Sequence, residues 1–324
     1  MYEKFFGLAH SPFNLTPDPS RFVPTPTHNE ALSALYYGIR WRKGIVVVTG
    51  EVGSGKTMLL SCLISQLQDS SDLKYAYLVN SRLTPIEFFQ YTLTEFDLPA
   101  TGKNKTEMLL DLSRFLKERG ARGLTTTLIV DEAHQLSEDL LEEIRLLSNF
   151  ETISEKLLQI LLVGQPELDE KLDSFGLRQL KQRIAVRAHI GPLNKAETVE
   201  YIALRLKSAG LEGQADLIFP AETSAVVYRY SRGLPRLINT ICENALVAAY
   251  AQKTQTVTVQ NIEGVVRELR IDVDILPEME SSMAVNEDGA EDDGITAEPL
   301  PAAVGSESSG LPSETEVAAK GGSQ

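Results

Sequence analysis

Hydrophobic residues in the first two thirds of the chain fall into two alternating patterns. Short β-branched or aliphatic runs predict strands, and between them hydrophobic residues recur every three or four positions, which predicts helices. Strands separated by helices indicate parallel pairing and a three-layer α/β domain over residues 44–192. The predicted strands are residues 45–49, 76–79, 125–130, 158–163 and 185–190, and the predicted helices are residues 59–67, 85–96, 106–119 and 137–150.

After residue 192 the strand pattern nearly disappears and only helical periodicity remains. Asn194 with Glu197 predicts a capping box at the start of the first helix of this region. Residues 193–271 are therefore expected to form a small helical domain. Its predicted helices cover residues 194–208, 221–230, 235–249 and 259–270.

Residues 1–43 form a leader that is rich in aromatic residues and prolines. The prolines exclude a long helix before about residue 27, and the hydrophobic pattern then predicts a helix over residues 27–41. We expect Thr27 to cap this helix, with Glu30 three residues later. The aromatic residues need an apolar surface, so we expect the leader to pack on the α/β domain.

The charge of the 324-residue chain is distributed unevenly. Residues 272–324 contain thirteen acidic residues and one basic residue, a net charge of −12 out of the total of −14. The preceding body is nearly neutral. Because residues 272–324 have few aliphatic and no aromatic residues, we expect a disordered acidic tail. It either keeps the protein soluble or binds a basic partner.

Several classes of protein are disfavoured by the sequence. No run approaches the ~18–20 apolar residues of a membrane span, and the first residues lack the cationic and apolar blocks of a signal peptide. Cys62 and Cys242 lie far apart in apolar contexts, which favours buried thiols over a disulfide or metal site. These features predict a cytoplasmic protein.

A glycine-rich segment follows the first predicted strand and matches the phosphate-binding pattern GxxxxGK[ST]. Its backbone N–H groups and the start of the next helix favour phosphate oxygens. Lys56 is expected to contact the β- and γ-phosphates of ATP, and the Thr57 hydroxyl to bind Mg²⁺. The predicted nucleotide-binding residues are Gly50, Glu51, Val52, Gly53, Ser54, Gly55, Lys56, Thr57 and Met58.

The strand at 125–130 ends in two acidic residues, Asp131 and Glu132. In a parallel sheet this strand end faces the same crevice as the glycine-rich loop. Asp131 is therefore expected to hold Mg²⁺, and Glu132 to act as the general base that activates water. The pair favours ATP hydrolysis over binding alone.

The chain resembles the AAA+ ATPases of the ExeA (GspA) type over residues 1–271. These proteins belong to general secretion and pilus loci, including the MSHA pilus, and are related to ATPases of exosortase loci and of TniB/TnsC-like transposition systems. Some continue into a membrane span and a peptidoglycan-binding domain, neither of which this sequence shows. Beside the glycine-rich loop, the resemblance rests on MYEKFFGL (1–8), PFNLTPDP (12–19), LIVDEAH (128–134), LLQILLVGQPEL (157–168), LRQLKQRI (177–184) and GLPRLIN (233–239).

The resemblance implies further roles near the nucleotide. Asn80 would hold the catalytic glutamate away from water until a partner engages, although it could simply form a turn. Gln165 would sense the γ-phosphate as sensor 1. His28 would lie near the adenine, and His134 either senses the nucleotide or is a plain loop residue.

In proteins of this family, arginine side chains act across the interface between subunits. Arg178, Lys181, Arg183 and Arg187 form a basic cluster, from which an arginine finger would reach a neighbour's γ-phosphate. Arg183 is the first choice and Arg178 the second, while a solvated face or a nucleic-acid patch are the alternatives. Arg236 would act as sensor 2 from the helical lid, or else pair with an acid.

The sequence therefore predicts an oligomerising, Mg²⁺-dependent AAA+ ATPase that assembles or remodels a bacterial secretion or pilus system. A partner would recruit it to the inner membrane, and direct membrane insertion is not expected. The alternative is a DNA-binding ATPase of the transposition or replication-initiator type, which the body's net charge of −2 disfavours. A third reading, a nucleotide-gated scaffold without turnover, is disfavoured by Glu132.

Overall fold

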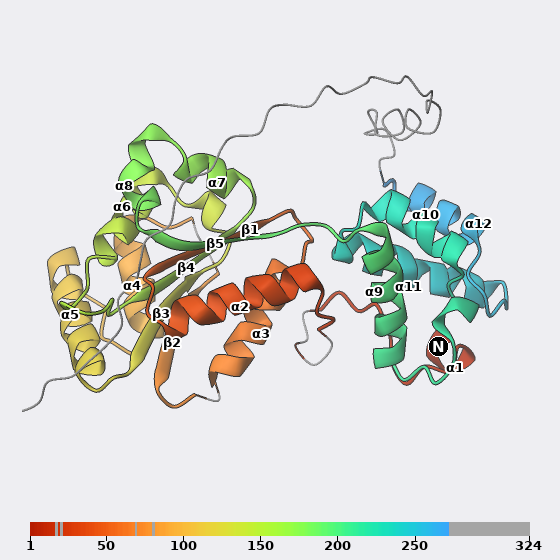
Figure 1. The fold of residues 1–324 in the computed structure, drawn as a ribbon, viewed down its shortest axis with the longest axis horizontal. Helices are drawn as coiled ribbons and strands as arrows, with labels where there is room; N and C mark the ends of the chain where they lie inside the picture. The colour runs from red at the N-terminus through yellow and green to blue at the C-terminus, as the bar shows by residue number, and fades with distance from the viewer. Residues whose placement is uncertain (17–18, 20–21, 69, 80–81, 272–324) are drawn as a thin grey trace, which may run out of the picture. The chain divides into compact units, whose positions relative to one another are not determined.

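The computed structural model describes residues 1–16, 19, 22–68, 70–79 and 82–271 (Figure 1). Asn80 and the acidic segment 272–324 lie outside the described residues, so their predicted roles remain predictions.

The centre of the α/β region is a parallel five-stranded sheet with the order β2-β3-β4-β1-β5. The strands β1, β3 and β4 are buried along their whole length, as expected for a sheet covered on both faces. Strand β1 lies between β4 and β5, with Val47 opposite Leu162 and Arg187. The strands are β1 (Ile45–Gly50), β2 (Leu73–Leu78), β3 (Thr125–Val130), β4 (Gln159–Gly164) and β5 (Ile184–Ile190).

Helices cover both faces of this sheet, which confirms the predicted three-layer α/β fold (Figure 1). One face packs against α2 (Pro26–Arg40) and α3 (Lys56–Gln68), through residues such as Leu35 and Leu63. The other face packs against α4 (Pro85–Glu95), α5 (Lys105–Ala121) and α6 (Glu138–Leu147).

Short helical segments connect the later strands, and the hydrophobic pattern did not predict them. They hold too few residues to show a helical repeat, and helices this short depend on tertiary contacts. They are η2 (Ala133–Gln135), α7 (Glu167–Leu172), η3 (Phe175–Leu177) and α8 (Arg178–Lys181).

The helical region has its own apolar cluster. Asn194 and Glu197 form the predicted capping box, and Pro235 is the first residue of its helix, as expected. The elements are α9 (Lys195–Ser208), η4 (Ala215–Leu217), α10 (Ala221–Ser231), α11 (Pro235–Ala251) and α12 (Val259–Glu268).

The first thirteen residues pack on this helical region, which differs from the expectation that the leader packs on the α/β domain. Helix α1 (Tyr2–Phe5) contacts α11, and Phe13 is fully buried in the same apolar cluster. The Tyr2 hydroxyl donates a 2.6 Å hydrogen bond to Glu243. The physical reason is that α2 and α3 already cover the nearer sheet face, while the helical region has an apolar face to bury.

The start of α2 also differs from the prediction. Thr25, not Thr27, is the N-cap, and its side chain accepts a hydrogen bond from the backbone of His28. Pro26 takes the first helical position, where its fixed φ and missing N–H are favourable. The proline therefore moves the cap two residues earlier than the Thr27–Glu30 spacing predicts.

Candidate functional site

The glycine-rich loop between β1 and α3 has a backbone that requires glycine. Gly53 and Gly55 have φ values of +83° and +101°. A Cβ at Gly53 would lie 3.0 Å from Arg236 Cβ, and one at Gly55 would lie 2.8 Å from His28 Nε2. The two glycines therefore allow both the turn and the close approach of flanking side chains.

Lys56 is the first residue of α3, and its side chain is folded into the loop. Its Nζ donates hydrogen bonds to the carbonyl oxygens of Gly50 at 2.7 Å and Glu51 at 2.9 Å. Burial lowers the pKa of Lys56, while the carboxylates of Glu132 and Asp131 act in the opposite direction. The ammonium group of Lys56 is thus held against two carbonyl oxygens at the start of the loop.

Asp131 follows β3 directly and is buried. Its Oδ1 accepts from the backbone N–H of Glu132 at 2.9 Å, and its Oδ2 accepts from the Tyr77 hydroxyl at 3.1 Å. Burial raises the pKa of Asp131, and burial also raises the pKa of Tyr77, with the Asp131 charge adding to it. The carboxylate is therefore oriented from both sides.

Tyr77 contacts the predicted Mg²⁺ ligand Asp131, and the sequence reasoning did not single it out. It lies on β2 opposite Ile129, and Asp131 is two positions beyond Ile129 on β3. Because side chains two apart share one face of a strand, a correct register would have placed Tyr77 beside Asp131. The sequence alone does not give that register.

Glu132, His134 and Gln165 come together at the ends of β3 and β4. Gln165 Nε2 lies 3.5 Å from Glu132 Oε2, and the Gln165 amide lies 3.1 Å from His134 Nε2. His134 Nδ1 is 3.4 Å from Glu132 Oε2. Lys171 on α7 fixes this turn by donating to the carbonyl oxygens of His134 and Leu136 at 2.6 and 2.8 Å.

Most of the predicted nucleotide-binding residues line one cavity of about 370 Å³. The described lining does not include Gly50, Glu51, Ser54, Asp131, Arg178 or Arg183. The predicted residues that line the cavity are His28, Val52, Gly53, Gly55, Lys56, Thr57, Met58, Glu132, Gln165 and Arg236.

The helical region closes the cavity with residues that the sequence did not single out. Tyr201 and Arg205 lie one turn apart on α9, and the Tyr201 hydroxyl donates to Asn239 at 3.1 Å. Arg205 donates to the Asn14 carbonyl oxygen at 3.1 Å and lies over the Tyr201 ring. From the sequence, the four-residue spacing of Tyr201 and Arg205 indicates that they share a helix face, but it does not indicate that this face borders a cavity.

Arg236 occupies the position predicted for it, at the start of α11 and against the glycine-rich loop. Its backbone N–H donates to the Gly53 carbonyl oxygen at 3.2 Å. Arg236 and Lys56 both line the cavity.

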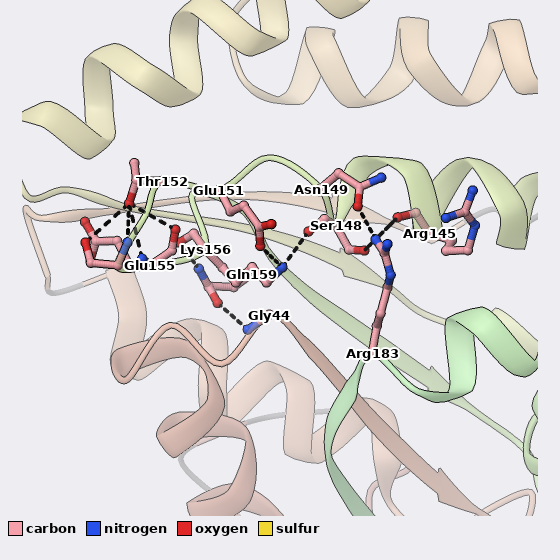
Figure 2. Close-up of polar contacts among 11 residues, drawn as sticks. Gly44, Arg145, Ser148, Asn149, Glu151, Thr152, Glu155, Lys156, Gln159 and Arg183 are labelled. Atoms are coloured by element: carbon pink, nitrogen blue, oxygen red, sulfur yellow. Dashed lines mark hydrogen bonds and ion pairs between the residues drawn. The ribbon is translucent and has the colours of Figure 1, made fainter.

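The basic cluster, by contrast, is divided among several partners. Arg183 donates to the Arg145 carbonyl oxygen at 3.1 Å, to Ser148 Oγ at 2.9 Å and to Asn149 Oδ1, as Figure 2 shows. These acceptors lie at the C-terminal end of α6, where a cation is favoured. The first-choice finger is therefore held by its own chain.

The other cluster members have different surroundings. Arg187 pairs with Asp169 at 2.8 Å and Asp173 at 3.5 Å, and Lys181 pairs with Asp173 at 2.9 Å. Arg178 is exposed, and its guanidinium lies 4.7 Å from the ring centre of Phe175, which is itself 81% exposed. Arg178 is thus the predicted finger that remains accessible.

The residues present fit a nucleotide phosphate and a hard cation. Ser54 Oγ is buried and has no hydrogen-bond partner among the described residues, and the glycines keep side chains out of the loop. Mg²⁺ prefers oxygen ligands and usually takes only one or two from protein. Thr57 and Asp131 supply such oxygens.

Comparison with known proteins gives three findings. Residues 39–172 match the family described as AAA domain. General secretion pathway protein A of Aeromonas hydrophila is 41% identical over 253 residues, which cover 78% of this chain and 45% of that protein. The ATP-dependent target DNA activator B of Escherichia phage Mu is 26% identical over 279 residues, covering 84% and 80%.

Among solved structures, CDC6P from Pyrobaculum aerophilum has a TM-score of 0.62 at 18% identity, and the match covers 85% of this chain and 74% of that one. At this identity the likeness shows the fold alone.

The parallel sheet, the glycine-rich loop and the match to the AAA domain family show the fold of an AAA+ P-loop NTPase. Within that class the chain is similar to General secretion pathway protein A, of whose length it spans less than half. The predicted fold class and the predicted similarity to the GspA type are confirmed, whereas ATP hydrolysis by this chain is a proposal. No helix in the described residues is both long and apolar enough to cross a membrane.

Proposed function

We propose that this chain binds ATP with Mg²⁺ in the cavity between the glycine-rich loop and the helical region, and hydrolyses it. The observation that carries the proposal is that Glu132 lines the same cavity as Lys56 and Thr57. A carboxylate in that place can act as a general base for water, which a site for binding alone does not need.

The chain's own groups divide the work of the reaction. Lys56 and the loop amides bind the β- and γ-phosphates, and Thr57 and Asp131 hold Mg²⁺, which neutralises phosphate charge when bound. Glu132 accepts a proton from water, and Gln165 orients Glu132 or the γ-phosphate. Arg236 adds positive charge from the opposite wall, and positioning supplies much of the rate.

The active form is an oligomer in which Arg178 reaches the nucleotide of a neighbouring subunit. The support is its exposure on Phe175, whereas the guanidinium of Arg183 is engaged by α6. A finger in trans predicts that specific activity rises steeply with protein concentration. Linear scaling of total activity down to the lowest dilutions would contradict this part of the proposal.

The cellular role we propose is to assemble or remodel components of a bacterial secretion or pilus system. The similarity to General secretion pathway protein A, at 41% identity, supports it. The protein would work in the cytoplasm, and a partner would bring it to the inner membrane.

A DNA-dependent ATPase is the second candidate. The similarity to a target DNA activator, at 26% identity, favours it. Against it, two of the four cationic residues at 178–187 form ion pairs with Asp169 and Asp173, which weakens that segment as a phosphate-binding patch.

The decisive test of the chemistry compares the wild type with Glu132→Gln. Turnover should fall by about 100-fold or more while ATP binding is kept, because only the general base is lost. Glu170→Gln removes an exposed acid on α7 and should leave turnover unchanged. If Glu132→Gln hydrolyses ATP at the wild-type rate, the proposed role of Glu132 is wrong.

The two cellular roles are separated by what the ATP-bound protein retains. Glu132→Gln protein held in ATP should capture secretion or pilus assembly proteins, and duplex DNA should not stimulate the wild type. Stimulation by duplex DNA that disappears at high salt would instead support the second candidate.

A further inference from the structure

The leader helix makes a direct polar contact with the glycine-rich loop. His28 lies in the first turn of α2 and is buried, and its Nε2 lies 2.9 Å from the carbonyl oxygen of Ser54. Its Nδ1 lies 2.6 Å from the hydroxyl of Thr25, the N-cap of the same helix. One imidazole therefore connects the start of α2 to the residue before Gly55.

These contacts determine which ring nitrogen carries the proton. The Ser54 carbonyl can only accept a hydrogen bond, so Nε2 of His28 must be the donor. The pKa of His28 is lowered by burial, which favours the neutral ring. Nδ1 is then an acceptor, and the Thr25 hydroxyl donates to it.

The contact has a consequence for the peptide between Ser54 and Gly55. A trans peptide is planar, and its C=O and N–H point in opposite directions. Because His28 holds the Ser54 carbonyl toward α2, the Gly55 N–H is turned toward the other side. Gly55 has a φ of +101° and could otherwise rotate more freely than any other residue type.

The anchor of His28 is rigid. Helix α2 packs on the sheet through Ala31, Leu35 and Ile39, which are all buried. A Cβ at Gly38 of this helix would lie 2.2 Å from a methyl group of Val46 on β1, so helix and strand are in close contact. The imidazole is therefore fixed relative to the strand that precedes the loop.

We infer that His28 is a positioning residue that orients the Gly55 amide of the glycine-rich loop for a nucleotide phosphate. This role differs from a wall of the adenine pocket, which was expected for His28. It rests on the proposed function, because it assumes that the loop binds phosphate. Thr25 takes part by fixing the ring tautomer.

Binding of two probes separates a phosphate role from an adenine role. Affinities for ATP and for inorganic tripolyphosphate, which has no base, are measured by calorimetry for the wild type and for three variants. His28→Leu removes the hydrogen-bond donor. His28→Gln places a side-chain amide at about the position that Nε2 occupies. His28→Asn carries the same amide on a side chain that is one methylene shorter.

His28→Leu and His28→Asn should weaken ATP and tripolyphosphate equally, by about fivefold, which corresponds to one lost hydrogen bond. His28→Gln should remain within about twofold of the wild type for both probes. If His28→Leu does not fold, the comparison of the Gln and Asn variants alone decides, since they differ only in reach.

Three outcomes would overturn the inference. The first is a loss for ATP with none for tripolyphosphate, which would assign His28 to the base. The second is failure of His28→Gln to restore binding, which would assign a role to ring shape alone. The third is unchanged affinity in every variant. If the wild type itself binds no ATP, the proposed function fails instead.

Discussion

The glycine-rich loop and the basic segment at residues 178–187 were both expected to act on the nucleotide, but the two regions differ in the structure. Most of the expected residues of the loop line one cavity. In the segment, Arg183 and Arg187 are engaged by acceptors of their own chain, and Arg178 points to solvent over Phe175.

The difference lies in which groups perform the function. In the proposed function the loop binds phosphate through backbone amides, whose positions follow from a short run of residues and from the strand and helix beside it. An arginine acts through a long side chain, and its end can reach several acceptors. Residue type and spacing therefore determine the backbone conformation of the loop, whereas they do not determine which acceptor each arginine side chain contacts.

The largest effect expected from the second region is that of Arg178→Ala. If this arginine acts in trans, turnover should fall by about 10³-fold at high protein concentration, while the melting temperature stays unchanged. Steady-state ATP hydrolysis and thermal unfolding measure the two quantities. Arg267→Ala, an exposed arginine on α12, is the control. Full turnover in Arg178→Ala would show that Arg178 is not the arginine finger.

Arg183→Ala should show the opposite pattern. Loss of hydrogen bonds to the end of α6 should cost about 2 kcal/mol and lower the melting temperature by about 4–8 °C. Turnover per folded molecule should stay within a few-fold of the wild type. Arg183→Lys, which keeps the charge but loses the planar fork, should be intermediate. Normal stability with lost turnover in Arg183→Ala would identify Arg183, and not Arg178, as the arginine finger.

His28 gives a smaller, pH-dependent effect. Burial holds the folded-state pKa of His28 below its ordinary value of about 6.5, so the folded chain binds fewer protons than the unfolded chain just below that pH. The free energy of unfolding should therefore fall as the pH drops below about 6.5. Denaturant titrations of the wild type and His28→Gln at several pH values isolate this effect. If the free energy of unfolding has the same slope against pH in both proteins, the prediction is contradicted.

Removal of residues 272–324 should have the smallest effect. The segment carries a net charge of −12, and every described residue that lines the cavity lies before it. ATP turnover of a chain ending at Ile271 should equal that of the full chain within about twofold. A loss of more than about tenfold would mean that the acidic segment takes part in the reaction.

The secondary structure was predictable wherever an element buries a regular face. All five strands and the long helices follow from hydrophobic periodicity and from caps such as Asn194. The short helices α7 and α8 were missed because four to six residues carry no period. The aromatic residues at the start of the leader pack on the helical region and not on the α/β domain, because burial requires an apolar partner that the sequence does not identify. Helix α2 of the same leader packs on the sheet as expected.

The site was predictable to a similar degree. Lys56, Thr57, Asp131 and Glu132 belong to local motifs next to a strand end, and the parallel sheet brings those ends together. Tyr77 and Arg205 were not predictable, because each acts through a contact between segments distant in the sequence.

The sequence by itself determined the class of the protein, since a glycine-rich turn between a buried strand and a helix is specified by neighbouring residues. The tertiary structure decided which side chains share the cavity and which arginine stays accessible. It also placed His28 against the Ser54 carbonyl. The physical reason is that backbone conformation depends mainly on local residues, whereas side-chain partners depend on register, packing and the competition among nearby acceptors.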